Sequence, residues 1–185
     1  MKVNLGCGNK LLKGYINLDK FEYYNCDVTH DLEKFPYPFK SNSIQEVLLS
    51  HVLEHIGQHP DTFINIMKEL YRICKNQSLI IINVPHPTHE DFLSDPTQVR
   101  PITILGLSLF DKKLNKEWQK AGAANTPLGL IHNINFKIES YEYVLDEDIN
   151  NLRNLGKISD QELQKMMLHN YNVIKQININ LRTIK

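Results

Sequence analysis

The sequence begins with a short apolar strand that runs directly into a Gly-x-Gly turn, Gly6-Cys7-Gly8. Glycine lets the backbone turn tightly and approach a ligand at a point where a Cβ atom would collide. Such a turn is typical of the first β–α unit of a Rossmann-like sheet. A dinucleotide fingerprint has a third glycine, where this chain has Leu11, and an acidic residue roughly 20 positions further on. Asp19 comes earlier than that, so the pattern favours a nucleoside ligand over NAD.

The length of 185 residues and the balanced composition indicate one globular domain, residues 1–185. The formal net charge is zero, and no basic run indicates a nucleic-acid or membrane partner. No apolar stretch reaches the roughly 20 residues of a membrane span. A strand that begins at residue 2 leaves no place for a signal peptide. The three cysteines form no CxxC pair or disulfide framework, which favours a reducing compartment. We therefore expect a cytoplasmic protein.

Hydrophobic patterns predict alternating strands and helices, the order of an α/β domain. Residues 63–74 carry an apolar stripe at helical spacing, and Pro60 suits the first turn of that helix. Residues 134–143 and 176–183 alternate apolar with polar side chains, which predicts an antiparallel edge pair with a bulge before Tyr141. Between them, Ser159 and Glu162 have the spacing of a helix capping box. Five parallel strands are expected at residues 3–5, 15–18, 24–26, 47–50 and 79–84.

Five segments, taken together, carry a family resemblance. They are Asn4-Leu5-Gly6-Cys7-Gly8, Asp19, Asp27-Val28 with Asp31-Leu32, Phe35-Pro36-Tyr37-Pro38-Phe39, and Leu49-Ser50-His51-Val52-Leu53-Glu54-His55-Ile56. In their order and spacing they resemble the class I S-adenosylmethionine (SAM) dependent methyltransferases. The last segment is similar to a Ser-x-Val-Leu-Glu-His segment of small-molecule methyltransferases in this class. The resemblance implies a Rossmann-like fold, a mostly parallel sheet with an antiparallel carboxyl-terminal edge pair, and S-adenosyl-L-methionine as the cofactor.

The resemblance also implies roles for the residues around the first two strands. The backbone amides of the turn are expected to meet the cofactor carboxylate, as turn amides do for anions; the turn comprises Gly6, Cys7, Gly8 and Asn9. Asp19, at the end of the second strand, is expected to accept hydrogen bonds from both ribose hydroxyls. An aspartate that follows a strand is also a common turn former.

The adenine end of the site has two pairs of candidates. Asp27 or Asp31 would accept a hydrogen bond from the adenine amino group, while Val28 or Leu32 would pack against the ring. These assignments follow from the resemblance, because both pairs come just after the expected third strand.

The segment after the fourth strand has two histidines one helical turn apart, His51 and His55. We interpret them as part of the cofactor wall or as a helix cap rather than as a metal pair. Glu54 lies between them and is expected to support the site from behind. No metal site is predicted here.

The first two crossovers, residues 9–13 and 19–27, are shorter than the roughly 10–12 residues that a crossover with a helix needs. The sequence therefore predicts a trimmed sheet with bare patches on one face, which a partner subunit could cover, as in a homodimer. No helical extension precedes the first strand, so any lid must come from residues 85–132.

The loop after the fifth strand is rich in titratable residues, and loops at that edge of a sheet often carry function. His86 or His89 could act as the base that takes a proton from the acceptor, with Asp91 or Asp95 fixing the ring tautomer. Arg100 could hold a carboxylate or phosphate of the substrate. Alternatively, Asp95 caps a helix and pairs with Arg100. His86 and His89 have the spacing of an HxxH metal pair, but the flanking prolines forbid the helix that such a pair needs.

No segment like Asn/Asp/Ser-Pro-Pro-Tyr follows the fourth strand, and in related families that segment clamps a planar amine. We therefore expect methyl transfer to O or N of a small polar metabolite or side chain. The alternatives are a non-catalytic SAM-binding module on the same fold, an NAD-linked enzyme, and a metal-dependent hydrolase that uses the loop histidines.

Overall fold

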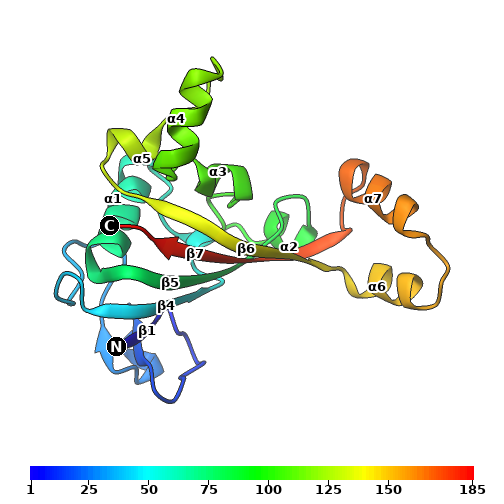
Figure 1. Cartoon of the computed structure of the whole chain (residues 1–185). Helices are drawn as coiled ribbons and strands as arrows, with labels where there is room; N and C mark the ends of the chain where they lie inside the picture. The colour runs from blue at the N-terminus through cyan, green and yellow to red at the C-terminus, as the bar shows by residue number, and fades with distance from the viewer.

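A seven-stranded sheet runs through the whole molecule in the computed structural model, which describes residues 1–185 (Figure 1). The strand order is β3-β2-β1-β4-β5-β7-β6. Strands β1 to β5 are parallel, and β7 is antiparallel to both of its neighbours. This arrangement confirms the predicted fold class. The strands span Lys2–Leu5 (β1), Ile16–Asp19 (β2), Val28–Thr29 (β3), Ile44–Ser50 (β4), Cys74–Pro85 (β5), Phe136–Leu145 (β6) and Ile174–Thr183 (β7).

The third strand lies later in the chain than the sequence pattern predicted. Tyr24 belongs to a short 3-10 helix, η1 (Glu22–Tyr24), which ends at Asn25 in the left-handed conformation with φ of 51°. The aromatic residues of this segment have high strand propensity, but their rings pack edge to face on one another instead. The prediction of a strand over residues 24–26 is therefore wrong.

Regular α-helices connect the strands only after β4. Helix α1 (Pro60–Ile73) begins at Pro60, as predicted, and helix α7 (Asp160–His169) has the predicted capping box between Ser159 and Glu162. The connections from β1 to β4 contain only η1, so the short first crossovers are confirmed. The remaining helices are η2 (Leu53–His55), α2 (Glu90–Leu93), α3 (Ile104–Ser108), α4 (Lys112–Lys120), α5 (Leu128–Ile131) and α6 (Glu147–Asn154).

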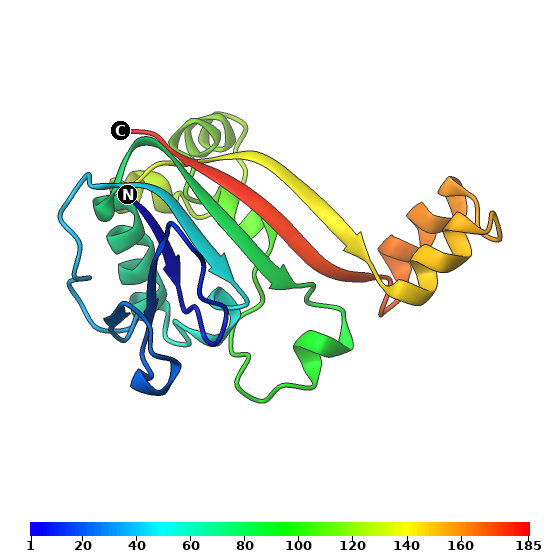
Figure 2. The same ribbon diagram turned by 90° about the horizontal axis from the view of Figure 1, so that it is seen from below.

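The hydrophobic core lies on one face of the sheet. Side chains alternate between the two faces of a strand, and the fully buried residues of each strand belong to one set, such as Val47 and Leu49 in β4 or Ile80 and Ile82 in β5. These side chains form a single cluster with the apolar stripe of α1. Figure 2 shows α1, α3 and α4 behind the strands, where this core lies.

The opposite face of the sheet carries a mixture of apolar and polar side chains. On this face Leu48 of β4 pairs with Ile81 of β5, and Ile81 pairs with Asn180 of β7. Half-buried apolar side chains on β4 and β5 are therefore followed by a polar side chain on β7. No helix lies in front of β4 and β5 in Figure 2. Parallel strands such as β4 and β5 are usually covered on both faces, whereas antiparallel strands tolerate one polar face in water. Covering of this face by a partner subunit stays a prediction.

Strands β6 and β7 extend beyond the rest of the sheet and carry α6 and α7 at their far end (Figures 1 and 2). Their pairing contains the predicted irregularity, which falls between Ile138 and Ser140. None of the helices in the molecule combines the length and the apolarity that crossing a membrane requires.

Candidate functional site

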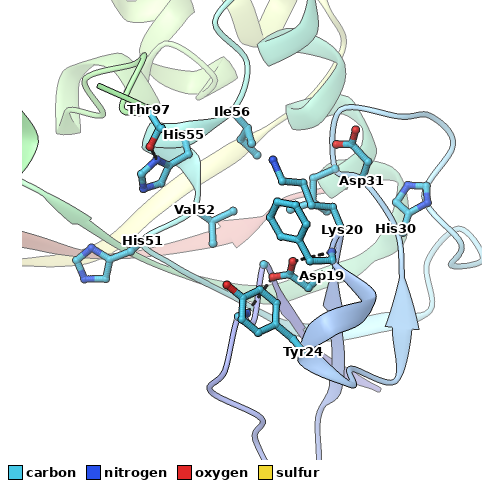
Figure 3. Close-up of a pocket in the computed structure, with 14 residues that line it drawn as sticks. Asp19, Lys20, Tyr24, His30, Asp31, His51, Val52, His55, Ile56 and Thr97 are labelled. Carbon is cyan, nitrogen blue, oxygen red and sulfur yellow. Dashed lines mark hydrogen bonds between the residues drawn. The ribbon is translucent and has the colours of Figure 1, made fainter. Parts of the chain in front are cut away.

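A cavity of about 490 Å³ opens where the parallel strands end (Figure 3). Ligands bind at this edge in open α/β sheets, and small-molecule sites typically measure about 300–1,000 Å³. The cavity is lined by the two turn glycines, by residues that follow β2 and β3, and by residues that follow β4. These are Gly6, Gly8, Asp19, Lys20, Phe21, Tyr24, His30, Asp31, Leu32, His51, Val52, His55 and Ile56, together with Thr97 from the loop after β5.

Gly6 brings the first turn against the segment that follows β4. Its φ is +68°, and a Cβ atom added there would lie 2.6 Å from Cγ2 of Val52. The turn therefore requires glycine at this position, both for its conformation and for its contact with Val52. The neighbouring Cys7 is buried, which raises the pKa of its thiol to about 11. Its side chain stays neutral and does not line the cavity.

The amides of this turn are mostly used within the protein. The N–H groups of Gly6 and Cys7 donate to the carbonyl oxygen of Leu18, at 2.8 and 3.0 Å. The Gly8 N–H donates to a carboxylate oxygen of Asp19 at 2.9 Å. These three amides are therefore already bonded within the protein, and their contact with a cofactor carboxylate stays a prediction. In the predicted turn only the N–H of Asn9 keeps no acceptor in the protein.

Asp19 ends β2 and is buried at the floor of the cavity. One carboxylate oxygen accepts from the Gly8 N–H, and the other accepts from the Phe21 N–H at 3.1 Å. A carboxylate has about four lone-pair positions. Two positions of Asp19 are therefore available to hydroxyl donors in the cavity, which is the number that a ribose diol needs.

The two pairs of adenine candidates are separated by the structure. Asp27 lies outside the cavity, and its carboxylate accepts from the backbone N–H of Asn17 at 2.7 Å and from the Asn17 amide at 3.1 Å. These two bonds lower the pKa of Asp27. Val28 packs against the core instead of the cavity. Of the two predicted alternatives, Asp31 and Leu32 line the cavity and Asp27 and Val28 do not. The contact of either pair with adenine stays a prediction.

The aromatic pair Phe21 and Tyr24 also faces the cavity, and the sequence analysis missed its role. The two rings meet edge to face with centroids 6.2 Å apart. The signal was present in the sequence, because Phe21 follows Asp19 by two residues. The sequence analysis gave Phe21 no role and assigned Tyr24 to a strand over residues 24–26. Rings next to a ribose-binding carboxylate offer a surface on which a base can stack.

His51 stands on the other side of the cavity from Asp19, beyond Val52 (Figure 3). Its Nε2 lies 3.0 Å from Oε1 of Gln176, and its Nδ1 lies 3.4 Å from Oε1 of Glu54. Glu54 is fully buried and does not line the cavity, and neither of its oxygens has a hydrogen-bond partner of good geometry. Contact with this carboxylate raises the pKa of His51, against the opposing effect of burial.

His55 is connected to the loop after β5 by a chain of hydrogen bonds. The Thr97 hydroxyl donates to Oδ1 of Asp95 at 2.7 Å, and the Thr97 N–H donates to the same oxygen at 2.8 Å. Nδ1 of His55 lies 2.9 Å from the Thr97 hydroxyl oxygen. These bonds to Thr97 lower the pKa of Asp95. Figure 3 shows His55 and Thr97 together at the rim of the cavity.

The two loop histidines predicted as bases lie elsewhere. His89 is buried, its Nδ1 accepts from the Asp91 N–H at 3.1 Å, and its Nε2 bonds to Asp146 at 3.3 Å. Both ring nitrogens are therefore occupied, so His89 has no free nitrogen with which to act as the predicted base in this structure. Asp91 does lie beside His89, as predicted, but as part of this structural contact. His86 bonds to Thr88 through Nδ1 and lines neither large cavity. Burial lowers the pKa of His86.

Arg100 is a structural clamp rather than a free anion binder. Its Nε and Nη2 donate to the carbonyl oxygen of Gly57 at 2.8 and 2.5 Å, and its guanidinium lies 4.3 Å from the centre of the Phe63 ring. Arg100 lines a second, mostly apolar cavity of about 390 Å³ between α1, α3 and α5, as does His132. The predicted pairing of Arg100 with Asp95 is not present.

Solved structures share this architecture over nearly the whole chain. A SAM-dependent methyltransferase from Archaeoglobus fulgidus aligns with a TM-score of 0.62 at 17% identity, covering 98% of this chain and 85% of that chain. The class I methyltransferase fold is the fold of this chain. The 1,6-didemethyltoxoflavin-N1-methyltransferase of Burkholderia thailandensis, solved with S-adenosylhomocysteine, aligns with a TM-score of 0.53 at 11% identity, covering 100% of this chain and 71% of that chain.

The same fold also occurs in a protein named for another reaction. The [4+2]-cyclase SpnF aligns with a TM-score of 0.54 at 11% identity, covering 99% of this chain and 75% of that chain. No protein-family model and no curated protein matches the sequence. The methyltransferase fold is thus established at the level of structure, and the activity has to be argued from the site.

Proposed function

We propose that this chain is a SAM-dependent methyltransferase that methylates O or N of a small polar acceptor. The observation that carries the proposal is Asp19, a buried carboxylate at the end of β2 that faces a cavity of nucleoside size with two acceptor positions to spare. Methyltransferases with the same fold support it. The proposal takes residues 1–185 as one domain in a cytoplasmic setting, in keeping with three free cysteines.

The residues around the cavity fit the parts of SAM. Asp19 would hold the ribose hydroxyls, and Asp31 would accept from the adenine amino group with Leu32 against the ring. Phe21 and Tyr24 would add apolar surface for the base. When bound, SAM supplies an activated methyl group, so the protein has to position the acceptor and remove its proton.

The substrate would enter beside the segment after β4 and under the loop of residues 85–132. Thr97 of this loop lines the first cavity, and Arg100 and His132 line the second. Among the loop residues predicted as catalytic, Asp95 is linked to the first cavity through Thr97. Nε2 of His86 has no hydrogen-bond partner, and a catalytic role for His86 stays a prediction.

Specific residues argue against two of the alternative functions. An NAD-linked enzyme is disfavoured by Leu11 in place of the third glycine. A hydrolase with a His86–His89 metal pair is disfavoured because both nitrogens of His89 are already bonded. A SAM-binding module without methyl transfer remains the main rival, because a fold alone does not fix an activity.

Calorimetric titration with SAM, S-adenosylhomocysteine and NADH tests the proposal. We expect the first two to bind and NADH not to bind. The Asp27→Ala variant is a matched control, because this aspartate lies outside the cavity and should leave SAM affinity unchanged. A chain that binds neither SAM nor S-adenosylhomocysteine would remove the proposed function altogether.

A further inference from the structure

We propose that His55 is the base that takes the proton of the methyl acceptor, and that His51 binds an acidic group on the same acceptor molecule. This inference rests on the proposed function and names its substrate class, an acid that carries a hydroxyl or amine. Both rings line one cavity on the side opposite Asp19 (Figure 3). Each ring is held by partners that determine where its protons lie.

The hydrogen bonds of Thr97 fix the tautomer of His55. A hydroxyl has one proton, and Thr97 donates it to the Asp95 carboxylate, which can only accept. The Thr97 oxygen must therefore accept from Nδ1–H of His55 at 2.9 Å. In the neutral ring this leaves Nε2 with a free lone pair, and no group in the protein bonds to it. A lone pair directed by a second bond at the other nitrogen is what a general base requires.

His51 has the opposite environment, with a hydrogen-bond acceptor near each ring nitrogen. Gln176 presents Oε1 to Nε2, and its amide nitrogen is held by Asn178 at 2.6 Å, which fixes the amide orientation. Glu54 lies 3.4 Å from Nδ1. A ring between two acceptors is favoured in its doubly protonated, cationic form.

The burial of Glu54 strengthens the case for a charged His51. Glu54 is fully buried and no group other than His51 is near enough to bond its oxygens, which is costly for a carboxylate unless a positive charge lies beside it. His51 lies within ion-pair distance of Glu54 and supplies that charge when its ring is doubly protonated. The imidazolium is about half exposed on the side of the cavity, so it can also bind an anionic group of a ligand.

The division of roles defines the reaction. The acceptor O–H or N–H bond breaks, and its proton moves to Nε2 of His55. A bond forms between the acceptor atom and the methyl carbon, while the electron pair of the methyl–sulfur bond stays on sulfur. The imidazolium of His51 stays protonated and holds a carboxylate or phosphate of the acceptor. His55 then releases its proton to solvent, since its ring is not fully buried.

Histidine tautomers can be measured by ¹⁵N NMR of the imidazole rings, which needs no acceptor. At neutral pH we expect the neutral His55 signal to show Nδ1–H with a bare Nε2, and we expect His51 to stay doubly protonated to a higher pH than an ordinary histidine. The Thr97→Val variant should remove this preference in His55. Thr88→Val is the matched control, because it removes the hydroxyl beside His86 instead and should leave His55 unchanged. An Nε2–H tautomer of His55 in the parent chain would overturn its role as the base.

Transfer of labelled methyl from SAM to hydroxy acids, amino acids and their matched amides tests the chemistry. We expect acids to react in preference to amides, and His55→Asn to lower turnover by about 100-fold or more without loss of SAM affinity. Equal transfer to the amides overturns the role of His51, and full activity of His55→Asn overturns that of His55. A chain that binds SAM but methylates no acid in the panel overturns the substrate class alone. Failure to bind SAM overturns the proposed function itself.

Discussion

Two segments of the chain concentrate histidines and carboxylates, and they use them in opposite ways. In the loop of residues 86–100, His89 and Arg100 are bonded to other parts of the protein at nearly every polar atom. In the segment of residues 51–55, which follows β4, His55 keeps a free nitrogen at the cavity and Glu54 lacks any hydrogen bond. The richer polar composition of the loop thus reflects its own folding, while the shorter segment leaves Nε2 of His55 without a partner at the cavity.

The comparison shows that polar density alone does not identify a site. A loop without regular structure has to satisfy its backbone and anchor itself by side-chain bonds, and histidine, aspartate and arginine serve this purpose well. The informative quantity is the polar atom that remains without a partner in a place where burial makes that costly.

The largest effect that separates the two segments is expected for His89→Ala. The variant removes a buried ring and its bonds to Asp91 and Asp146, so the free energy of unfolding should fall by about 2–3 kcal/mol. Affinity for SAM should not change, because His89 does not line the cavity. Urea denaturation and calorimetry measure the two quantities.

His86→Ala serves as the control for this experiment. Its ring is only half-buried and bonds to Thr88 within the same loop, so the loss of stability should stay below about 1 kcal/mol. If His89→Ala kept its stability and lost SAM binding, the loop would belong to the cofactor site and the comparison would be wrong.

Asp19→Ala, in contrast to His89→Ala, should lower the affinity for SAM. Loss of the hydrogen bonds to the ribose is expected to weaken SAM binding by about 1–3 kcal/mol, measured by the same calorimetric titration. Because Asp19 also accepts from the Gly8 and Phe21 amides, the thermal unfolding of the variant must be followed in parallel. Unchanged SAM affinity in a folded variant would remove Asp19 from the site.

Much of this fold could be predicted from the sequence, because it depends on local patterns. The apolar runs of β4 and β5, the stripe of α1 and the alternation in β6 and β7 each need only a few neighbouring residues to be read. Asp19 was found in the same way, since it directly follows a strand. The β3 prediction failed where strand propensity competed with a local aromatic cluster.

The parts of the site that could not be predicted depend on contacts between distant residues. His55 and Thr97 are 42 positions apart, and His89 and Asp146 are 57 positions apart. A single sequence gives the types of these residues but not their pairing. The sequence indicated that an aspartate of the loop fixes the tautomer of a histidine in the same loop. In the structure Asp95 instead reaches His55 through Thr97, and His55 lies in the segment after β4.

The smallest expected effect concerns His51 and the pH dependence of stability. The carboxylate of Glu54 raises the pKa of His51, Gln176 adds to this, and Lys10 and burial oppose it. A raised pKa in the folded state means that the contribution to stability is fully present below the unfolded pKa, about 6.5. It is lost as the pH rises through the folded value. The change is small, because the ring is about half exposed and solvent screens the pair.

Thermal unfolding of the parent chain and of Glu54→Gln between about pH 5.5 and pH 8.5 measures this contribution, since that range spans the ordinary titration of histidine. We expect the parent to lose stability relative to the variant as the pH rises, because glutamine removes the charge that favours the imidazolium. If the unfolding temperatures of the parent and of Glu54→Gln changed in parallel over the whole pH range, Glu54 would not raise the pKa of His51. The segment after β4 would then lose its cation while keeping the base, and the acceptor would need no acidic group.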